Sequence, residues 1–149
     1  MKTRLQIFAL LSLFSVTAFS CLVERSSLPD MPVAIIRTIS LSGNLSERGG
    51  FLYINQRKNE FDRIGFGGIL IYHGLNDEYY AVDLACPKDL KSNIIIERPD
   101  FSGLCKCPVC GEVYDMSSGF GTPTKGIAKE SLKHYVINLI GQDEIQVTN

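Results

Sequence analysis

Short runs of β-branched and aromatic residues recur along this chain, and clusters of turn-forming residues separate them at roughly eight- to twelve-residue intervals. No long segment repeats apolar residues with the 3.6-residue period of an amphipathic helix. The pattern therefore predicts an all-β fold. The expected single strands cover residues 33–41, 50–54, 94–97, 104–106 and 112–115.

Two further pairs of apolar runs predict hairpins, because each pair flanks a short group of turn-forming residues. Segments 68–72 and 78–84 flank the sequence His-Gly-Leu-Asn-Asp. Segments 132–139 and 145–148 flank Gly-Gln-Asp-Glu near the C-terminus. Both arms of the first hairpin are rich in Ile, Tyr and Val, so we expect them to line the core, and the second arm leads directly into a Cys-Pro pair.

The first twenty residues have the pattern of an export signal. Lys2 and Arg4 precede an apolar run at 5–19, which is too short to span a membrane. The residues that lead into Cys21 resemble the lipobox of bacterial lipoproteins. That resemblance implies that Cys21 is acylated and becomes the first residue of the mature chain. Ordinary signal cleavage near Ser20, which leaves a free thiol, is the alternative.

This signal divides the chain into a signal peptide at 1–20, a polar tether at 21–31 and one domain at 32–149, which is long enough to have its own core. We expect an exported protein that a lipid anchors at the periplasmic face or the cell surface, without crossing the membrane. The net charge is −1, and there is neither a basic stripe nor a glycine-rich phosphate loop. Nucleic acid is therefore excluded as a partner.

Four of the five cysteines lie in one part of this domain and are the strongest chemical signal in the chain. Cys107 and Cys110 belong to a Cys-Pro-Val-Cys-Gly turn, a geometry in which backbone N–H groups stabilise two metal-binding thiolates. Cys86 and Cys105 complete a set of four. In an exported protein the same residues are equally consistent with two disulfides, so both states stay open at this point.

The order of its motifs makes the domain resemble the Rieske iron–sulfur domain over residues 33–147. In that family a hairpin leads into a first cysteine loop, a second cysteine loop follows, and an aromatic-Asp pair, glycine turns and a closing hairpin complete the domain. The resemblance implies an antiparallel β-sandwich of small stacked sheets with two cysteine-bearing loops at its tip. The matching positions here are Cys86, Pro87, Cys107, Pro108, Gly111, Tyr114, Asp115, Gly119, 126–128 and 132–137.

The metal ligands depart from the family pattern. Where the family places two histidines, this chain has Lys88 in the first loop and Cys110 in the second. The two histidines present, His73 and His134, lie outside both loops and are expected to be structural. Lys88 is expected to be a solvated loop residue, because its ammonium group would have to lose a proton to bind metal. A Rieske cluster in its ordinary form is not expected, since one of its irons needs two imidazoles.

The four sulfurs leave three states open. They can hold one Zn or Fe ion in a tetrahedral all-cysteine site, or an all-cysteine [2Fe–2S] centre. The resemblance also implies that Cys86 and Cys107 are close neighbours, so that a disulfide between them would join the two loops without metal. The signal lacks the twin arginine of export systems for folded proteins, which argues against a cluster loaded in the cytoplasm.

The expected role is binding or electron transfer rather than substrate turnover, since no catalytic motif is present. The main hypothesis is a metal or iron–sulfur module that serves as an electron carrier or a structural site, with a redox protein as its partner. The rival hypothesis is a cluster-free domain, braced by disulfides, that acts as an interaction module for a surface protein. The residues expected to support the tip loops are Pro87, Pro108, Gly111, Tyr114 and Asp115.

Overall fold

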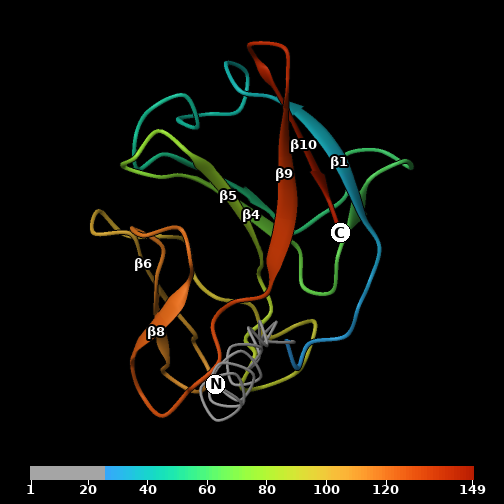
Figure 1. Cartoon of the computed structure of the whole chain (residues 1–149). Helices are drawn as coiled ribbons and strands as arrows, with labels where there is room; N and C mark the ends of the chain where they lie inside the picture. The colour runs from blue at the N-terminus through green and yellow to red at the C-terminus, as the bar shows by residue number, and fades with distance from the viewer. Residues whose placement is uncertain (1–25) are drawn as a thin grey trace, which may run out of the picture.

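The computed structural model describes residues 26–149. The predicted signal peptide, the predicted acylation site Cys21 and the first part of the predicted tether lie outside the described residues. Within residues 26–149, no helix is long and apolar enough to cross a membrane. The regular structure of this part of the chain consists of β-strands (Figure 1).

All of the strand pairs are antiparallel, and they form two sheets, which confirms the predicted all-β fold. The larger sheet has the order β2-β4-β5-β9-β10-β1-β3, and the smaller has the order β6-β7-β8. The strands are β1 (Val33–Thr38), β2 (Phe51–Ile54), β3 (Arg63–Ile64), β4 (Ile69–His73), β5 (Tyr79–Asp83), β6 (Leu104–Lys106), β7 (Val113–Asp115), β8 (Thr122–Lys125), β9 (His134–Ile140) and β10 (Glu144–Thr148).

The larger sheet curves around a cluster of buried side chains that we call the body core. In Figure 1, β1, β9 and β10 stand on one side of this part of the molecule, and β4 and β5 on the other. Nearly all of the cluster is aliphatic, so its burial is driven mainly by the hydrophobic effect. The body core consists of Val33, Ile35, Ile39, Leu45, Ile54, Ile69, Ile71, Ala81, Tyr135, Ile145 and Val147.

A second cluster, which we call the tip core, combines residues of the β4–β5 hairpin with residues of the smaller sheet and its loops. It differs from the body core in composition, because it contains three buried cysteines, two tyrosines and a methionine. The tip core consists of Leu70, Tyr72, Val82, Leu84, Cys86, Ile96, Cys105, Cys107, Tyr114, Met116 and Leu132.

The β4–β5 hairpin belongs to both cores, because successive side chains of a strand point to opposite faces. Ile69 and Ile71 pack in the body core, whereas Leu70 and Tyr72 pack in the tip core. All five residues of β4 are buried. This double burial explains why residues 69–72 of the strand show no alternation between apolar and charged residues. The predicted hairpin thus lines the core, as expected, and on both of its faces.

Three short segments differ from the sequence-based expectation. The segment predicted as a strand at 94–97 contributes only an isolated bridge between Ala85 and Ile95. Strand β3 has two residues and lies at the end of a charged segment that favours a loop. Strand β8 lies at the edge of the smaller sheet, is mostly exposed and contains Pro123, so neither an apolar run nor an alternating pattern predicts it.

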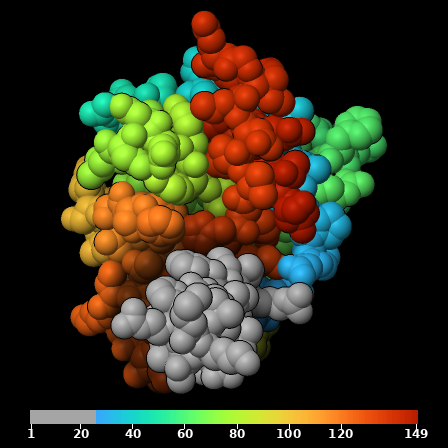
Figure 2. Space-filling model, viewed as in Figure 1, coloured from blue at the N-terminus to red at the C-terminus, as the bar shows by residue number. Residues whose placement is uncertain are grey.

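The residues just before β1 pack against the segment that leads into β9. The Ser26 hydroxyl donates a hydrogen bond to the Glu130 carboxylate at 2.9 Å. The Lys133 ammonium donates to the carbonyl oxygen of Pro29 at 2.8 Å and to the carboxylate of Asp30 at 2.6 Å. The described part of the predicted tether is therefore bound to the domain. In Figure 2 the β9–β10 hairpin forms the red ridge that projects at one end of the molecule.

Candidate metal site

Asp83 anchors the start of the first tip loop. Its carboxylate is fully buried. One oxygen accepts hydrogen bonds from the N–H groups of Ala85 at 2.7 Å and Gly67 at 2.9 Å, and the other accepts from the Phe66 N–H at 2.9 Å and the Tyr135 hydroxyl. Four donors compensate the burial of one carboxylate. The chain therefore leaves β5 from a rigid point.

The first tip loop begins at Cys86 and turns back at once. The Cys86 N–H donates to the carbonyl of Ile94 at 3.0 Å, and the Cys86 carbonyl accepts from the N–H groups of Asp89 at 3.2 Å and Leu90 at 3.1 Å. Such a turn brings a residue close to the third residue after it. The loop therefore presents the side chains of Cys86 and Asp89 together.

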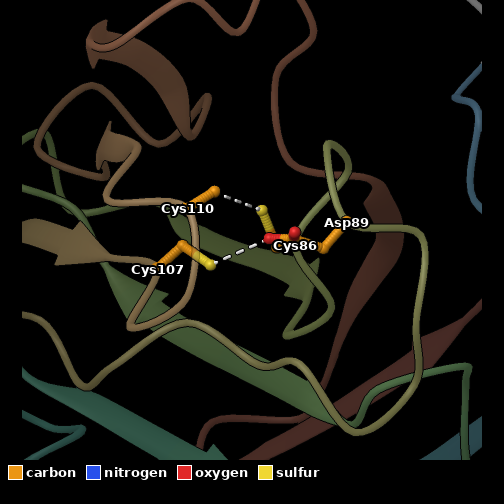
Figure 3. Close-up of side chains that lie close together, drawn as sticks. All are labelled: Cys86, Asp89, Cys107 and Cys110. Carbon is orange, nitrogen blue, oxygen red and sulfur yellow. Dashed lines mark hydrogen bonds between the residues drawn. The ribbon is translucent and has the colours of Figure 1, made fainter.

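The second tip loop connects β6 to β7 and contains the Cys-Pro-Val-Cys-Gly turn. The Cys107 N–H donates to the Glu112 carbonyl at 2.8 Å, and the Gly111 N–H donates to the Cys107 carbonyl at 3.0 Å. Gly111 has a φ of 75°, a left-handed conformation that glycine adopts without strain. The turn closes tightly and leaves Cys107 and Cys110 facing the first loop (Figure 3).

Four side chains from the two loops converge: Cys86 and Asp89 from the first, Cys107 and Cys110 from the second. One potential metal-ligating atom of each lies within 4.8 Å of the others. The Sγ atoms of Cys86 and Cys110 are 3.5 Å apart, and the Cys107 thiol donates to Asp89 Oδ2 at 3.2 Å (Figure 3). Cys86 and Cys107 are buried, whereas Asp89 and Cys110 are partly exposed. The group therefore lies at the border between the tip core and solvent.

Asp89 was not among the residues that the sequence singled out. The sequence feature that could have identified it is its position, three residues after Cys86 in the sequence Cys-Pro-Lys-Asp. That spacing brings two side chains together only when the loop makes the tight turn observed here. A carboxylate oxygen is also an ordinary ligand for zinc, so it extends the donor set that the cysteines provide.

Cys105 lies outside this group. It belongs to β6, where it is directly opposite Tyr114 of β7, and its side chain is fully buried in the tip core. Burial, above all, raises the pKa of its thiol to about 12. Cys105 therefore behaves as a small apolar residue in this structure. The strand register decides this, because Lys106 beside it faces outward.

Both histidines lie away from the tip loops. The His73 Nδ1–H donates to the carbonyl of Leu45 at 3.1 Å, and its ring stacks on Tyr79. The His134 Nε2–H donates to the carbonyl of Phe120 at 2.8 Å. Neither belongs to the group of potential ligands found in residues 26–149. The imidazole pair that a Rieske cluster requires is therefore not provided by these residues.

The thiols and the carboxylate of the site affect one another's protonation. Burial raises the pKa of the Cys107 thiol and of the Cys110 thiol. Hydrogen bonds from Cys110, and then from Cys107 and Cys86, lower the pKa of Asp89. Of the three thiols, Cys107 donates to the Asp89 carboxylate, whereas Cys86 and Cys110 contact each other. Binding of a metal ion to the sulfurs releases thiol protons, so its affinity rises with pH.

Lys88, which stands where the resemblance places a histidine, joins the two loops through an ion pair. Its ammonium donates to Glu112 Oε1 at 2.9 Å, and this hydrogen bond raises the pKa of Lys88. Glu112 also accepts hydrogen bonds from the N–H groups of Ile127 at 2.8 Å and Ala128 at 3.0 Å. The Lys88 contact, followed by these two, lowers the pKa of Glu112 to about 2.

Glu112 therefore connects three segments with one carboxylate. Glu112 is only 1% exposed, so these hydrogen-bond partners must offset the free-energy cost of burying its charge. The close approach of the third segment requires a glycine, since a Cβ at Gly126 would lie 1.9 Å from a Glu112 oxygen. The cysteine loops are thus held in place by contacts that do not involve their sulfurs.

The residues predicted to support the tip loops are distributed around this group. The Tyr114 hydroxyl lies 3.6 Å from Cys86 Sγ, and burial raises the pKa of that hydroxyl. Asp115 accepts a hydrogen bond from the Ser117 N–H at 2.7 Å and shapes the turn after β7. Pro87 is buried directly beside Cys86, whereas Pro108 is exposed at the outside of the second loop.

The spacing of the four donor atoms suits a single ion. A tetrahedral ion with metal–sulfur bonds of about 2.3 Å separates its sulfurs by about 3.8 Å. The distance of 3.5 Å between the sulfurs of Cys86 and Cys110 is close to this value. A two-iron cluster attaches its protein ligands in pairs at opposite ends and therefore needs donors that are further apart. Three sulfurs and one oxygen fit Zn or Fe in one tetrahedral site.

Comparison with known proteins gives distant structural similarities, two of which are described here. No protein-family profile and no curated protein matches the chain. A chain from the complex of reduced oxygenase and oxidized ferredoxin in carbazole 1,9a-dioxygenase is similar with 12% identity and a TM-score of 0.46, over 75% of this chain and 99% of that one. A protein described as an NADH-dependent nitrite reductase small subunit from Mycobacterium tuberculosis is similar with 12% identity and a TM-score of 0.45, over 80% of this chain and 97% of that one. At these scores the overlaps carry no conclusion about ligand, activity or partner.

Proposed function

We propose that the tip of this protein is a binding site for one metal ion, Zn or Fe, with Cys86, Asp89, Cys107 and Cys110 as ligands. The observation that carries the proposal is the convergence of four donor atoms, from two loops, within 4.8 Å of one another. Two of the residues are buried, and the thiols and the carboxylate face one another across the two loops. A single metal ion between the loops can take all four as ligands.

The ion gives the protein one of two roles. Iron in a thiolate site exchanges one electron, whereas zinc serves to fix structure. The position of the site favours electron transfer over a buried structural role, since Asp89 and Cys110 are partly exposed. A partner protein can then approach the ion from the side of these two residues. We propose an electron-carrying module in the iron-loaded form, with a redox protein as its partner.

The proposed location follows from the N-terminal sequence. A signal at 1–20 and acylation of Cys21 would place the domain on a membrane surface outside the cytoplasm. We also propose that the domain is a divergent relative of Rieske proteins. Its ligand set would differ from theirs, with three cysteines and one aspartate in place of two cysteines and two histidines.

Metal analysis of the mature protein, purified from the compartment to which it is exported, tests this proposal. We expect one ion per chain, and a coloured, charge-transfer spectrum if the ion is iron. The variants Cys110→Ser and Asp89→Ala should each lose most of the bound metal. Cys105→Ala is the matched control, because it removes a buried cysteine outside the group, and it should keep the ion.

Two results would overturn the proposal. Two irons per chain together with acid-labile sulfide would indicate a [2Fe–2S] cluster. A protein that contains no metal and cannot be loaded with Zn or Fe after reduction would not be a metal protein at all. Loss of the ion in Cys105→Ala to the same degree as in Cys110→Ser would show that the ligand set is wrong.

A further inference from the structure

The sulfurs of Cys86 and Cys110 are in direct contact across the two tip loops. They lie 3.5 Å apart, although 24 positions separate them in the sequence. A disulfide requires the two sulfurs to approach to about 2.0 Å, which is a short movement from this starting point. Cys110 is also partly exposed, so a small soluble oxidant can reach it.

Cys107 is oriented differently. From the sequence alone, Cys107 and Cys110 would be the expected redox pair, because they form a Cys-x-x-Cys turn. In the structure the Cys107 thiol donates to Asp89 Oδ2 at 3.2 Å, toward the first loop (Figure 3). Among the described residues, Cys86 and Cys110 are the cysteine pair whose sulfurs are in hydrogen-bond contact, whereas the Cys107 thiol is directed toward Asp89. The geometry thus selects the bridge between the loops over the bridge within the turn.

We propose that a peroxide converts Cys86 and Cys110 to a disulfide, and that this oxidation releases the metal ion of the site. The inference rests on the proposed metal-binding function and adds its regulation. Two of the four ligands are consumed by the bridge, and the remaining Cys107 and Asp89 hold a tetrahedral ion poorly. The tip then alternates between two states, one joined by a metal ion and the other by a covalent bond.

The reaction balances with hydrogen peroxide as the oxidant. The Cys110 sulfur attacks one peroxide oxygen, the O–O bond breaks, and a sulfenic acid and hydroxide form. The Cys86 sulfur then attacks the Cys110 sulfur, a second hydroxide leaves, and the S–S bond forms. The two sulfurs lose two electrons, the two oxygens gain them, and two protons from solvent convert both hydroxides to water. With zinc in the site, the ion leaves with its charge unchanged, because Zn²⁺ is not redox-active.

Peptide mapping can distinguish the two bridges. Trypsin cleaves after lysine and arginine except before proline, which places Cys86 in peptide 64–88, Cys105 in peptide 92–106 and the Cys-x-x-Cys pair in peptide 107–125. A bridge between the loops joins two peptides into one species. A bridge within the turn leaves peptide 107–125 alone and two hydrogens lighter. The two outcomes therefore differ in mass before any fragmentation.

The experiment treats the full-length, zinc-loaded protein with hydrogen peroxide and follows zinc release with a chromogenic chelator, while samples are alkylated and digested. We expect the joined peptide to form in step with zinc release, one ion for each bridge. Dithiothreitol should reverse the bridge and restore binding. The joined peptide should be lost in Cys110→Ser, and it should still form in Cys107→Ser, which assigns it to Cys110.

Cys105→Ala is the matched control and should behave like the wild type. A light, unjoined peptide 107–125 in the oxidised wild-type protein would overturn the inference, and so would zinc release without any joined peptide. If a serine variant fails to fold, fragmentation of the joined wild-type peptide still assigns the bridge. A failure of the proposed function is separate, since it shows as absent metal in the reduced protein before peroxide is added.

Discussion

The body core and the tip core share the β4–β5 hairpin but are closed by different kinds of interaction. The body core is almost entirely aliphatic and is surrounded by a seven-stranded sheet. The tip core contains three cysteines, is covered by a three-stranded sheet, and is bounded by loops whose polar groups face one another. One half of the molecule therefore depends on packing, whereas the other depends also on what its polar groups bind.

This difference indicates how a small domain can keep its fold while it carries a reactive site. Apolar burial stabilises a structure regardless of ligands. Thiols and carboxylates at a surface stabilise it only when their partners are present. We expect the two halves to respond differently to the same perturbation, and the four experiments below test that expectation in order of decreasing effect.

The largest effect should come from a cavity in the body core. Ile145 is fully buried on β10, so Ile145→Ala should lower the free energy of unfolding by about 3 kcal/mol. Ile140, 41% exposed on the adjacent β9, provides the matched control, and its alanine variant should cost far less. Urea denaturation measures both. If the two variants are equally destabilised, the body core does not carry the stability of the domain.

Removal of the ion should act on the tip alone. At a free ion concentration one hundred times Kd, binding contributes about 2.7 kcal/mol to the stability of the part that binds it. A chelator should therefore accelerate amide hydrogen exchange in β6 and β7 and leave β9 and β10 protected. Hydrogen exchange with mass spectrometry makes this measurement. Equal loss of protection in both sheets would mean that the two cores unfold as one unit.

The ion pair between Arg37 and Asp62 should make a pH-dependent contribution to the body. Two Arg37 nitrogens donate to the Asp62 carboxylate at 3.1 and 2.7 Å, and the Asp62 side chain is 4% exposed. The Arg37 hydrogen bond, more than any other contact, lowers the pKa of Asp62. Because the Arg37 side chain keeps some solvent contact, Asp62→Asn should cost about 2 kcal/mol near neutral pH, as for the loss of a buried hydrogen-bond partner.

The sign of the pH dependence follows from the lowered pKa of Asp62. Its contribution is fully present above the unfolded-state pKa of about 4, and it is lost as the pH falls through the lower pKa of the folded state. The stability difference between the wild type and Asp62→Asn should therefore shrink in acid. Urea denaturation at a series of pH values measures this difference. A difference that grows as the pH falls would contradict the assignment.

The smallest effect should come from the ion pair that joins the tip loops. Lys88→Met removes the ammonium from Glu112, which keeps its two backbone donors. We expect a small decrease in Tm, less than that of Asp62→Asn, with the metal content unchanged. Lys91→Met, in the same loop region, is the control and should have no effect. Loss of the ion in Lys88→Met alone would mean that Lys88 is needed for binding.

Much of the fold was predictable because the residue patterns that indicate strands extend over only a few neighbouring positions. The run from Ile69 to Tyr72 has no charged residue, and it forms most of a strand that is buried on both faces. The strand at Leu104–Lys106 was predicted with its observed limits. Strand β8 was not predicted, because an exposed edge strand with Pro123 has the composition of a loop and is formed by pairing with β7.

The site was predictable in part. Cysteines at a Cys-x-x-Cys spacing indicate a turn that presents sulfur, and the structure brings Cys107 and Cys110 together with Cys86. It does not include Cys105, whose side in β6 depends on strand register. It includes Asp89 instead, whose role depends on the turn that follows Cys86.

Residue order alone settled the all-β class and the chemistry available at the tip, because alternation, turn residues and cysteine spacing act over a few positions. Tertiary structure decided which side chains meet. The contacts between Cys86 and Cys110 and between Lys88 and Glu112 both join residues 24 positions apart. Such contacts depend on how the two sheets position the two tip loops relative to each other. No local sequence pattern determines the distance between side chains on different loops.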